Sequence, residues 1–267
     1  MAVRITTELL GDHPRLSEIS TDLPVTASWI RGSDGFIAFG TYKKHVVQGK
    51  RRFADASHWW QNELSQLEIK NNVHGVGTGP ILFASFAFIE DEPSTLIIPE
   101  IVVVQKGGKS WITWIGESQP EIRKSTYQSS HLDLEWSAGA LSEEAWKKAV
   151  EQSVHQIKSG RLEKVVLARD VAALANREID PAALIQSLET EYPSTWLFLV
   201  DNLIGATPEL LVRLNKSLVT SRVLAGTIRR TGDDQRDLAL AGSLTRSSKD
   251  LEEHEYAAVS YTHLTLP

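Results

Sequence analysis

The chain has 267 residues with a formal net charge of −6, 42% hydrophobic residues and 23% charged residues. This composition is typical of a globular protein of one large or two smaller domains, and it excludes a disordered or collagen-like chain. The acidic balance argues against nucleic-acid or anionic-membrane partners, and zero cysteine excludes disulfides and thiolate metal sites. No apolar run approaches the roughly 20 residues that span a bilayer, and the N-terminus lacks a signal peptide, so we expect a cytoplasmic protein.

The first half of the chain is predicted to consist mostly of strands in an antiparallel sheet. Residues 106–109, Lys-Gly-Gly-Lys, are typical of a hairpin turn. A helix is predicted over 55–69, because Trp60, Leu64 and Leu67 recur at helical spacing. The expected strands cover 36–39, 81–88, 96–104 and 111–115.

The second half alternates helices and strands, after polar residues 116–141 that predict a subdomain junction. Ser142 is a good N-cap for a helix that ends at Gly160, and Pro181 begins a second helix that ends near Tyr192. Further strands are expected at 164–170, 196–200, 210–214 and 218–223, with a charged helix from Ser247. The prediction is an α+β fold with a large, mostly antiparallel sheet flanked by helices, in two domains at 1–135 and 140–259.

Each of the first candidate sites, taken singly, also has an interpretation that gives it only a structural role. The glycine-rich segment 75–79 is followed by a proline and a strand, so it is interpreted as a turn and not as a nucleotide-binding loop. The histidines show no metal-ligand spacing. Lys164 either snorkels to water or accepts a proton beside a cleft. Glu209 is either a turn residue or a partly desolvated general acid.

Two later segments also carry alternative interpretations. The small residues and the hydroxyl of Leu224-Ala225-Gly226-Thr227 either line a ligand or form a plain loop beside two arginines. Asp250 and Glu253 are three residues apart and project from one helix face. Their oxygens suit a hard cation such as Mg²⁺, or else the helix face is simply solvated.

Together, four motifs in this order resemble the consecutive motifs of the chorismate-utilising enzymes, which include isochorismate, salicylate, anthranilate and aminodeoxychorismate synthases. The resemblance covers 142–255. Members that add water carry Lys at the position of Lys164, whereas ammonia-using members typically carry Gln. The resemblance therefore implies an isochorismate synthase, with salicylate synthase as the alternative, serving menaquinone or siderophore biosynthesis. The motifs are Lys-Val-Val-Leu-Ala-Arg at 164–169, Gly-Ala-Thr-Pro-Glu-Leu-Leu at 205–211, Leu-Ala-Gly-Thr-Ile-Arg-Arg at 224–230 and Ser-Lys-Asp-x-x-Glu-His at 248–254.

The resemblance also implies roles for the site residues. Mg²⁺ would bind the ring carboxylate of chorismate and would be held by Glu253, with Asp250 in or next to its shell. Lys164, as a neutral amine, would activate a water for attack at C2, and Glu209, kept protonated, would protonate the departing C4 hydroxyl. No obligate protein partner is implied. The substrate would be lined by Ala225, Gly226 and Thr227.

Three other outcomes stay open at this stage: a binding-only homologue, an ammonia-dependent synthase with an unusual Lys164, and an inactive fragment. The family continues well past Glu253-His254, and the apolar periodicity of its helix is lost over 260–267. We therefore expect a C-terminally truncated chain with a non-native tail over 260–267, poorly soluble when expressed alone.

Overall fold

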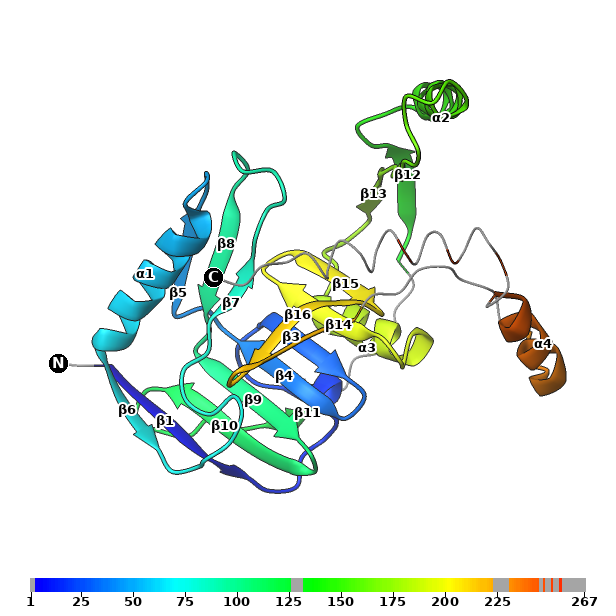
Figure 1. Ribbon diagram of the computed structural model, residues 1–267. Helices are drawn as coiled ribbons and strands as arrows, with labels where there is room; N and C mark the ends of the chain where they lie inside the picture. Colours follow the sequence, from blue (N-terminus) through cyan, green and yellow to red (C-terminus); the bar gives the residue numbers. More distant parts are fainter. Residues whose placement is uncertain are drawn as a thin grey trace. The chain divides into compact units, whose positions relative to one another are not determined.

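Figure 1 shows the computed structural model of the protein. Its residue contacts divide the chain into two units, one of residues 1–126 with 184–267 and the other of residues 127–183. No helix among the described residues is long and apolar enough to cross a membrane. The structure describes residues 3–125, 132–222 and 231–244, together with Ser247, Leu251 and Glu255.

An eight-stranded sheet forms the centre of the first unit, in the order β15-β14-β3-β4-β9-β10-β1-β6. Neighbouring strands are antiparallel, as predicted, except β1 and β6, which run parallel. Because β14 pairs with β3, a segment from the second half of the chain extends a sheet built by the first half. The strands are β1 (Val3–Leu10), β3 (Val25–Arg31), β4 (Asp34–Phe39), β6 (Leu67–Asn71), β9 (Ile101–Lys106), β10 (Lys109–Ile115), β14 (Trp196–Val200) and β15 (Leu203–Thr207).

Side chains bury both faces of this sheet, which explains why β9 begins with four consecutive buried apolar residues. Ile37 and Phe39 point to one face, where they pack with η1 (Leu16–Glu18) and with Ile185 of α3 (Pro181–Glu191). Ala38 points to the other face and packs with Phe83. The predicted hairpin at 106–109 is confirmed, and so is the predicted α3 helix.

The predicted turn at 75–79 is also confirmed, because it lies outside any helix or strand and packs on the second face of the sheet. The indole of Trp111 donates to the carbonyl of Gly77 at 3.1 Å, and Gly79 N–H donates to the buried Thr7 hydroxyl at 3.1 Å. Gly77 has φ of 80°, and a Cβ there would lie 2.4 Å from the ring of Phe36. The glycines therefore serve close packing.

A smaller layer of helix α1 (Arg52–Ser65) and a three-stranded sheet packs around Val47, Ala56 and Leu96. The predicted helix over 55–69 is wrong at its end, because Leu67 and Ile69 belong to β6 and pair with β1. Sheet hydrogen bonds to β1 replace the helical bonds that their spacing predicted. The strand predicted over 81–88 is shorter than expected. The three-stranded sheet of this smaller layer contains β5 (Lys43–Val47), β7 (Phe83–Ser85) and β8 (Ser94–Ile98).

The second unit contains helix α2 (Glu143–Lys158) and a two-stranded ribbon of β12 (Leu134–Ala138) and β13 (Val171–Ala175). The predicted N-cap is confirmed, because the Ser142 hydroxyl accepts a hydrogen bond from Ala145 N–H at 3.2 Å. The strand predicted at 164–170 is wrong: these residues are irregular, and the strand begins at Val171. Strand β12 was not expected from its polar surroundings.

The remaining described elements are short. The strands predicted near 210–214 and 218–223 are confirmed as a hairpin, and most residues of its first strand are exposed. Helix α4 was not predicted. Most of the helix expected from Ser247 lies outside the described residues. The remaining described elements are β2 (Ile19–Ser20), β11 (Arg123–Lys124), β16 (Leu210–Asn215), β17 (Leu218–Arg222) and α4 (Asp234–Leu244).

Candidate functional site

Glu209 lies in the first unit, in the two-residue break between the edge strand β15 and β16. Its backbone N–H donates to the Thr207 hydroxyl at 3.2 Å, which fixes the chain direction after Pro208. Its side chain is exposed. Glu209 therefore follows the end of a sheet strand and is accessible to solvent.

The glycine of this motif has a packing role. A Cβ on Gly205 would lie 2.7 Å from the ring of Phe198 on the neighbouring strand β14, so only glycine lets the two strands lie as they do. Thr207 positions the backbone of Glu209 through its hydroxyl, whereas Gly205 serves the packing of β15 against Phe198. A glycine within a strand pattern was the sequence signal for such a close approach.

Lys164 lies in the second unit, in the irregular segment between α2 and β13, and is exposed. Asp170 fixes the far end of this segment, because its two carboxylate oxygens accept the N–H of Ala140 at 3.0 and 3.1 Å. A Cβ on Gly139 would lie 2.2 Å from the Asp170 Cγ, so glycine is needed there. Neither Gly139 nor Asp170 was predicted from the sequence; Asp170, which directly follows the first motif, was the available signal.

The other predicted site residues lie outside the described residues. They are the proposed substrate-lining residues Ala225, Gly226 and Thr227 and the proposed metal ligands Asp250 and Glu253. Within residues 3–125, 132–222 and 231–244, no three His, Asp or Glu side chains cluster closely enough to hold a metal ion. The chemistry of the predicted donor set, two carboxylates, fits a hard cation such as Mg²⁺.

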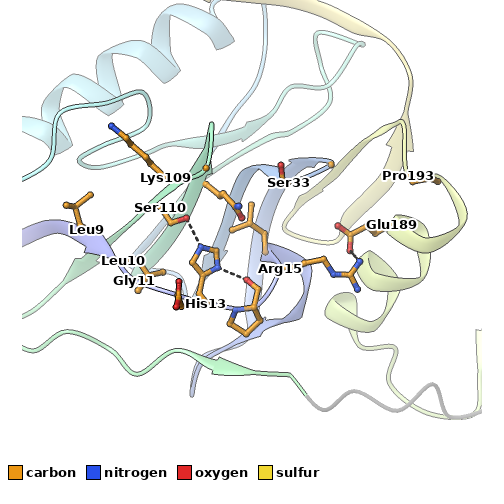
Figure 2. A pocket seen from close by; sticks show the side chains of 16 residues that line it. Leu9, Leu10, Gly11, His13, Arg15, Ser33, Lys109, Ser110, Glu189 and Pro193 are labelled. Carbon is orange, nitrogen blue, oxygen red and sulfur yellow. Dashed lines mark hydrogen bonds and ion pairs between the residues drawn. The ribbon is translucent and has the colours of Figure 1, made fainter.

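An open groove of about 910 Å³ lies on the first unit, beside the segment that joins β1 to η1 (Figure 2). His13 bridges it: Nδ1 lies 2.5 Å from the carbonyl oxygen of Pro14, and Nε2 lies 2.6 Å from the Ser110 hydroxyl. Arg15 hydrogen-bonds Glu18 at 2.8 Å and lies 3.9 Å from Glu189. None of the described site residues predicted from the sequence lines this groove.

The polar groups of the groove stabilise the fold around it. The Arg15 guanidinium lowers the pKa of the Glu18 carboxyl by hydrogen bonding. The Ser17 hydroxyl donates to Glu189 at 2.5 Å, and the Gln186 amide donates to the Ser17 carbonyl at 2.8 Å. These contacts tie η1 to α3 across more than 160 residues of sequence.

The geometry of the two units does not by itself identify the protein family, so we compared the chain with known proteins. A family model described as chorismate binding enzyme matches residues 29–261. The salicylate biosynthesis isochorismate synthase of Pseudomonas aeruginosa is 36% identical over 260 residues, covering 85% of this chain and 53% of that protein. The isochorismate synthase MenF of Bacillus subtilis is 29% identical over 244 residues, covering 80% of this chain and 50% of that protein.

A solved structure gives the same result for the fold. The menaquinone-specific isochorismate synthase MenF of Escherichia coli matches with a TM-score of 0.71 at 17% identity, over 95% of this chain and 61% of that one. The α+β fold expected from the sequence is thereby confirmed. The chain spans about half the length of the curated relatives it matches.

Proposed function

Because this chain belongs to the chorismate-binding enzyme family, we propose that the protein it represents converts chorismate to isochorismate. The observation that carries the proposal is the family match over residues 29–261, together with relatives that are named isochorismate synthases. Lys164 supports the water-using reaction within the family, since the ammonia-using members typically carry Gln at this position.

In the proposed reaction, a water oxygen bonds to C2 while Lys164 takes its proton. The ring double bonds shift, and the C4–oxygen bond breaks as Glu209 protonates the departing hydroxyl. One water is added and one is released, so the product is an isomer of the substrate. A substrate can reach Lys164 and Glu209, because both residues are exposed. The partial desolvation that was one interpretation of Glu209 is not seen, so its role as the acid rests on the motif resemblance.

The proposal includes a binding role for the residues outside the described ranges. Ala225, Gly226 and Thr227 would line the substrate, and the Thr227 hydroxyl would donate to it. Glu253, with Asp250 beside it, would hold Mg²⁺ at the ring carboxylate. When bound, the ion would supply positive charge that draws electron density from the ring.

Purified enzyme that includes this chain, given chorismate and Mg²⁺, should form isochorismate. Lys164→Ala and Glu209→Gln should each lower kcat by about 10²- to 10⁴-fold, the usual contribution of one general acid or base. The matched controls are Lys158→Ala and Glu178→Gln, which change exposed residues of the same charge in the second unit. Full activity of either site variant would contradict its assigned role.

The product identifies the reaction. Release of pyruvate with salicylate would favour the salicylate synthase alternative, and an aminated product that depends on ammonium would favour the ammonia-using one. No turnover of chorismate would leave a binding-only or inactive chain. If Glu253→Ala leaves the dependence of the rate on Mg²⁺ concentration unchanged, the metal assignment is wrong.

A further inference from the structure

A row of three side chains crosses the edge of the large sheet, where β3, β14 and β15 lie side by side (Figure 1). Thr207 of β15 lies opposite Trp196 of β14, so both side chains point to the same face. The guanidinium of Arg31, the last residue of β3, lies 5.1 Å from the centroid of the Trp196 ring and is therefore on that face too. Neighbouring strands are about 4.8 Å apart, so the Cα atoms of Arg31 and Thr207 are separated by about 10 Å.

The candidate acid Glu209 follows this row at the same end of the sheet. Arg31 ends β3, Trp196 begins β14, and Thr207 ends β15, after which the chain leads into Glu209. The Glu209 N–H donates to the Thr207 hydroxyl at 3.2 Å, and this hydroxyl belongs to the face that carries Arg31. A cation and the candidate acid therefore lie on one face of the sheet, where a single small ligand can contact both.

The fold holds the Arg31 guanidinium in place but gives it no anionic partner. The ring of Trp196, over which the guanidinium lies, stacks on Trp29 with centroids 5.5 Å apart. The acid opposite Arg31 in the β3–β4 hairpin is Asp34, but its carboxylate accepts a hydrogen bond from Lys106 at 2.5 Å instead. None of the ion pairs within residues 3–125, 132–222 and 231–244 includes Arg31, which is half-buried. Arg31 is thus a preorganised cation that can bind an anion.

We propose that Arg31 binds a carboxylate of the substrate beside Glu209. The inference rests on the proposed function, in which the substrate is chorismate, a compound with one carboxylate on its ring and one on its enolpyruvyl side chain. The proposed metal ion takes the ring carboxylate, so Arg31 is assigned the side-chain carboxylate, which a guanidinium can hold with two parallel N–H···O bonds. This carboxylate does not change during the reaction. The contact therefore contributes to substrate binding and not to the chemical step.

Steady-state kinetics test this role, because loss of a binding contact changes KM and not kcat. In purified enzyme that includes this chain, Arg31→Gln should raise KM for chorismate about 10- to 100-fold, while kcat stays within about three-fold. Arg31→Lys keeps the charge but not the two parallel bonds, and should raise KM by a smaller factor. The matched control is Arg4→Gln, which changes an exposed arginine of β1 that pairs with Glu68 at 3.5 Å and should leave KM within about two-fold. An unchanged KM for Arg31→Gln, or a fall in kcat alone, would overturn the proposal.

A binding measurement separates this inference from the proposed reaction. In the Lys164→Ala background, equilibrium dialysis measures the Kd of chorismate, and adding Arg31→Gln should raise it about 10- to 100-fold. For chorismate esterified at the side-chain carboxylate, the same change should alter Kd by less than about two-fold, because the ester has no charge for the guanidinium to hold. Equal losses for the acid and the ester would overturn the direct contact.

The two proposals fail in different ways. If the parent enzyme forms no isochorismate but Arg31→Gln still weakens the binding of chorismate and not that of the ester, the proposed reaction is wrong and the assignment of Arg31 stands. If the parent enzyme forms isochorismate and Arg31→Gln matches it in KM and Kd, only the assignment of Arg31 is wrong. If chorismate does not bind to the parent enzyme, both are wrong.

Discussion

The large sheet of the first unit and the ribbon and helix of the second unit have equally regular apolar patterns but very different burial. In the first unit, Ile30, Ile37 and Phe39 are fully buried between the sheet and the elements that cover it. In the second unit, α2 has no buried residue, and Trp136 on β12 is 66% exposed. The pattern thus predicts that an element forms and which face is apolar, but burial requires a second apolar surface.

The cross-strand pairs of the second unit show how apolar its uncovered face is. Trp136 pairs with Ala173, and Leu134 and Ala138 pair with Ala175 and Val171, so one face of the β12–β13 ribbon carries only apolar side chains. A two-stranded ribbon alone is marginally stable in water. We therefore expect the two units to differ in stability, and two experiments test that difference.

The largest effect should come from the core of the first unit. Phe39→Ala should lower the free energy of unfolding of the first unit by about 3–5 kcal/mol, because it removes a fully buried ring and leaves a cavity. Trp136→Ala is a comparable truncation in the second unit. It should change the free energy of unfolding of that unit by less than about 0.5 kcal/mol, because the side chain is already exposed. Urea unfolding followed by far-UV circular dichroism measures both. Similar losses for the two variants would show that β12 is packed in solution and that the contrast between the units is wrong.

A smaller effect is expected for protease access. Trypsin should cut after Arg161, Lys164 or Arg169 at least about ten-fold faster than after Lys106 or Lys109. The first three residues lie in the irregular, exposed segment between α2 and β13, whereas the last two flank a tight hairpin with paired strands. Mass spectrometry of the earliest fragments identifies the sites. Early cleavage after Lys106 would mean that the β9–β10 hairpin opens as readily as the second unit.

Elements that depend on local signals could be predicted from the sequence, whereas elements that depend on pairing with a distant strand could not. Helix α2 follows from local signals, a serine cap and apolar residues at helical spacing, and it forms where predicted. The end of α1 could not be predicted locally, because Leu67 keeps the helical spacing of Trp60 and Leu64 and belongs to a strand only by pairing with β1, more than 60 residues away. Position in the sheet, and not propensity, decides that segment.

For the candidate site, too, the sequence predicts the candidate catalytic residues but not the residues that hold them in position. The motif order predicts Lys164 and Glu209 as a pair of catalytic groups, but the neighbours that position them depend on contacts between strands and loops. The ring of Phe198 requires glycine at Gly205, and the Asp170 carboxylate requires glycine at Gly139. Neither contact is visible in one segment, because each joins residues from two different elements.

The smallest effect concerns an ion pair that links two turns of the well-packed sheet. Lys106 Nζ lies 2.5 Å from one Asp34 carboxylate oxygen, and Gly107 N–H donates to the other at 2.9 Å. The hydrogen bond from Lys106, and then that from Gly107, lowers the pKa of Asp34 below its ordinary value. A carboxyl with a lowered pKa stabilises the folded state above the ordinary pKa of about 4, and this contribution is lost as pH falls through the lowered value.

Asp34→Asn should therefore lower Tm by about 1–3 °C at pH 7, and the difference from the parent chain should shrink as the pH falls below the ordinary pKa of about 4 and through the lowered pKa of Asp34. The effect is small because the Asp34 side chain is 35% exposed and water screens the pair. Asparagine keeps an acceptor for Gly107 N–H, so the change removes mainly the charge. Glu117→Gln, an exposed acid that lies just after β10, is the control and should leave Tm unchanged. A Tm difference for Asp34→Asn that does not shrink at any pH below about 4 would mean that shape or packing, and not the Lys106 charge, accounts for the stabilisation.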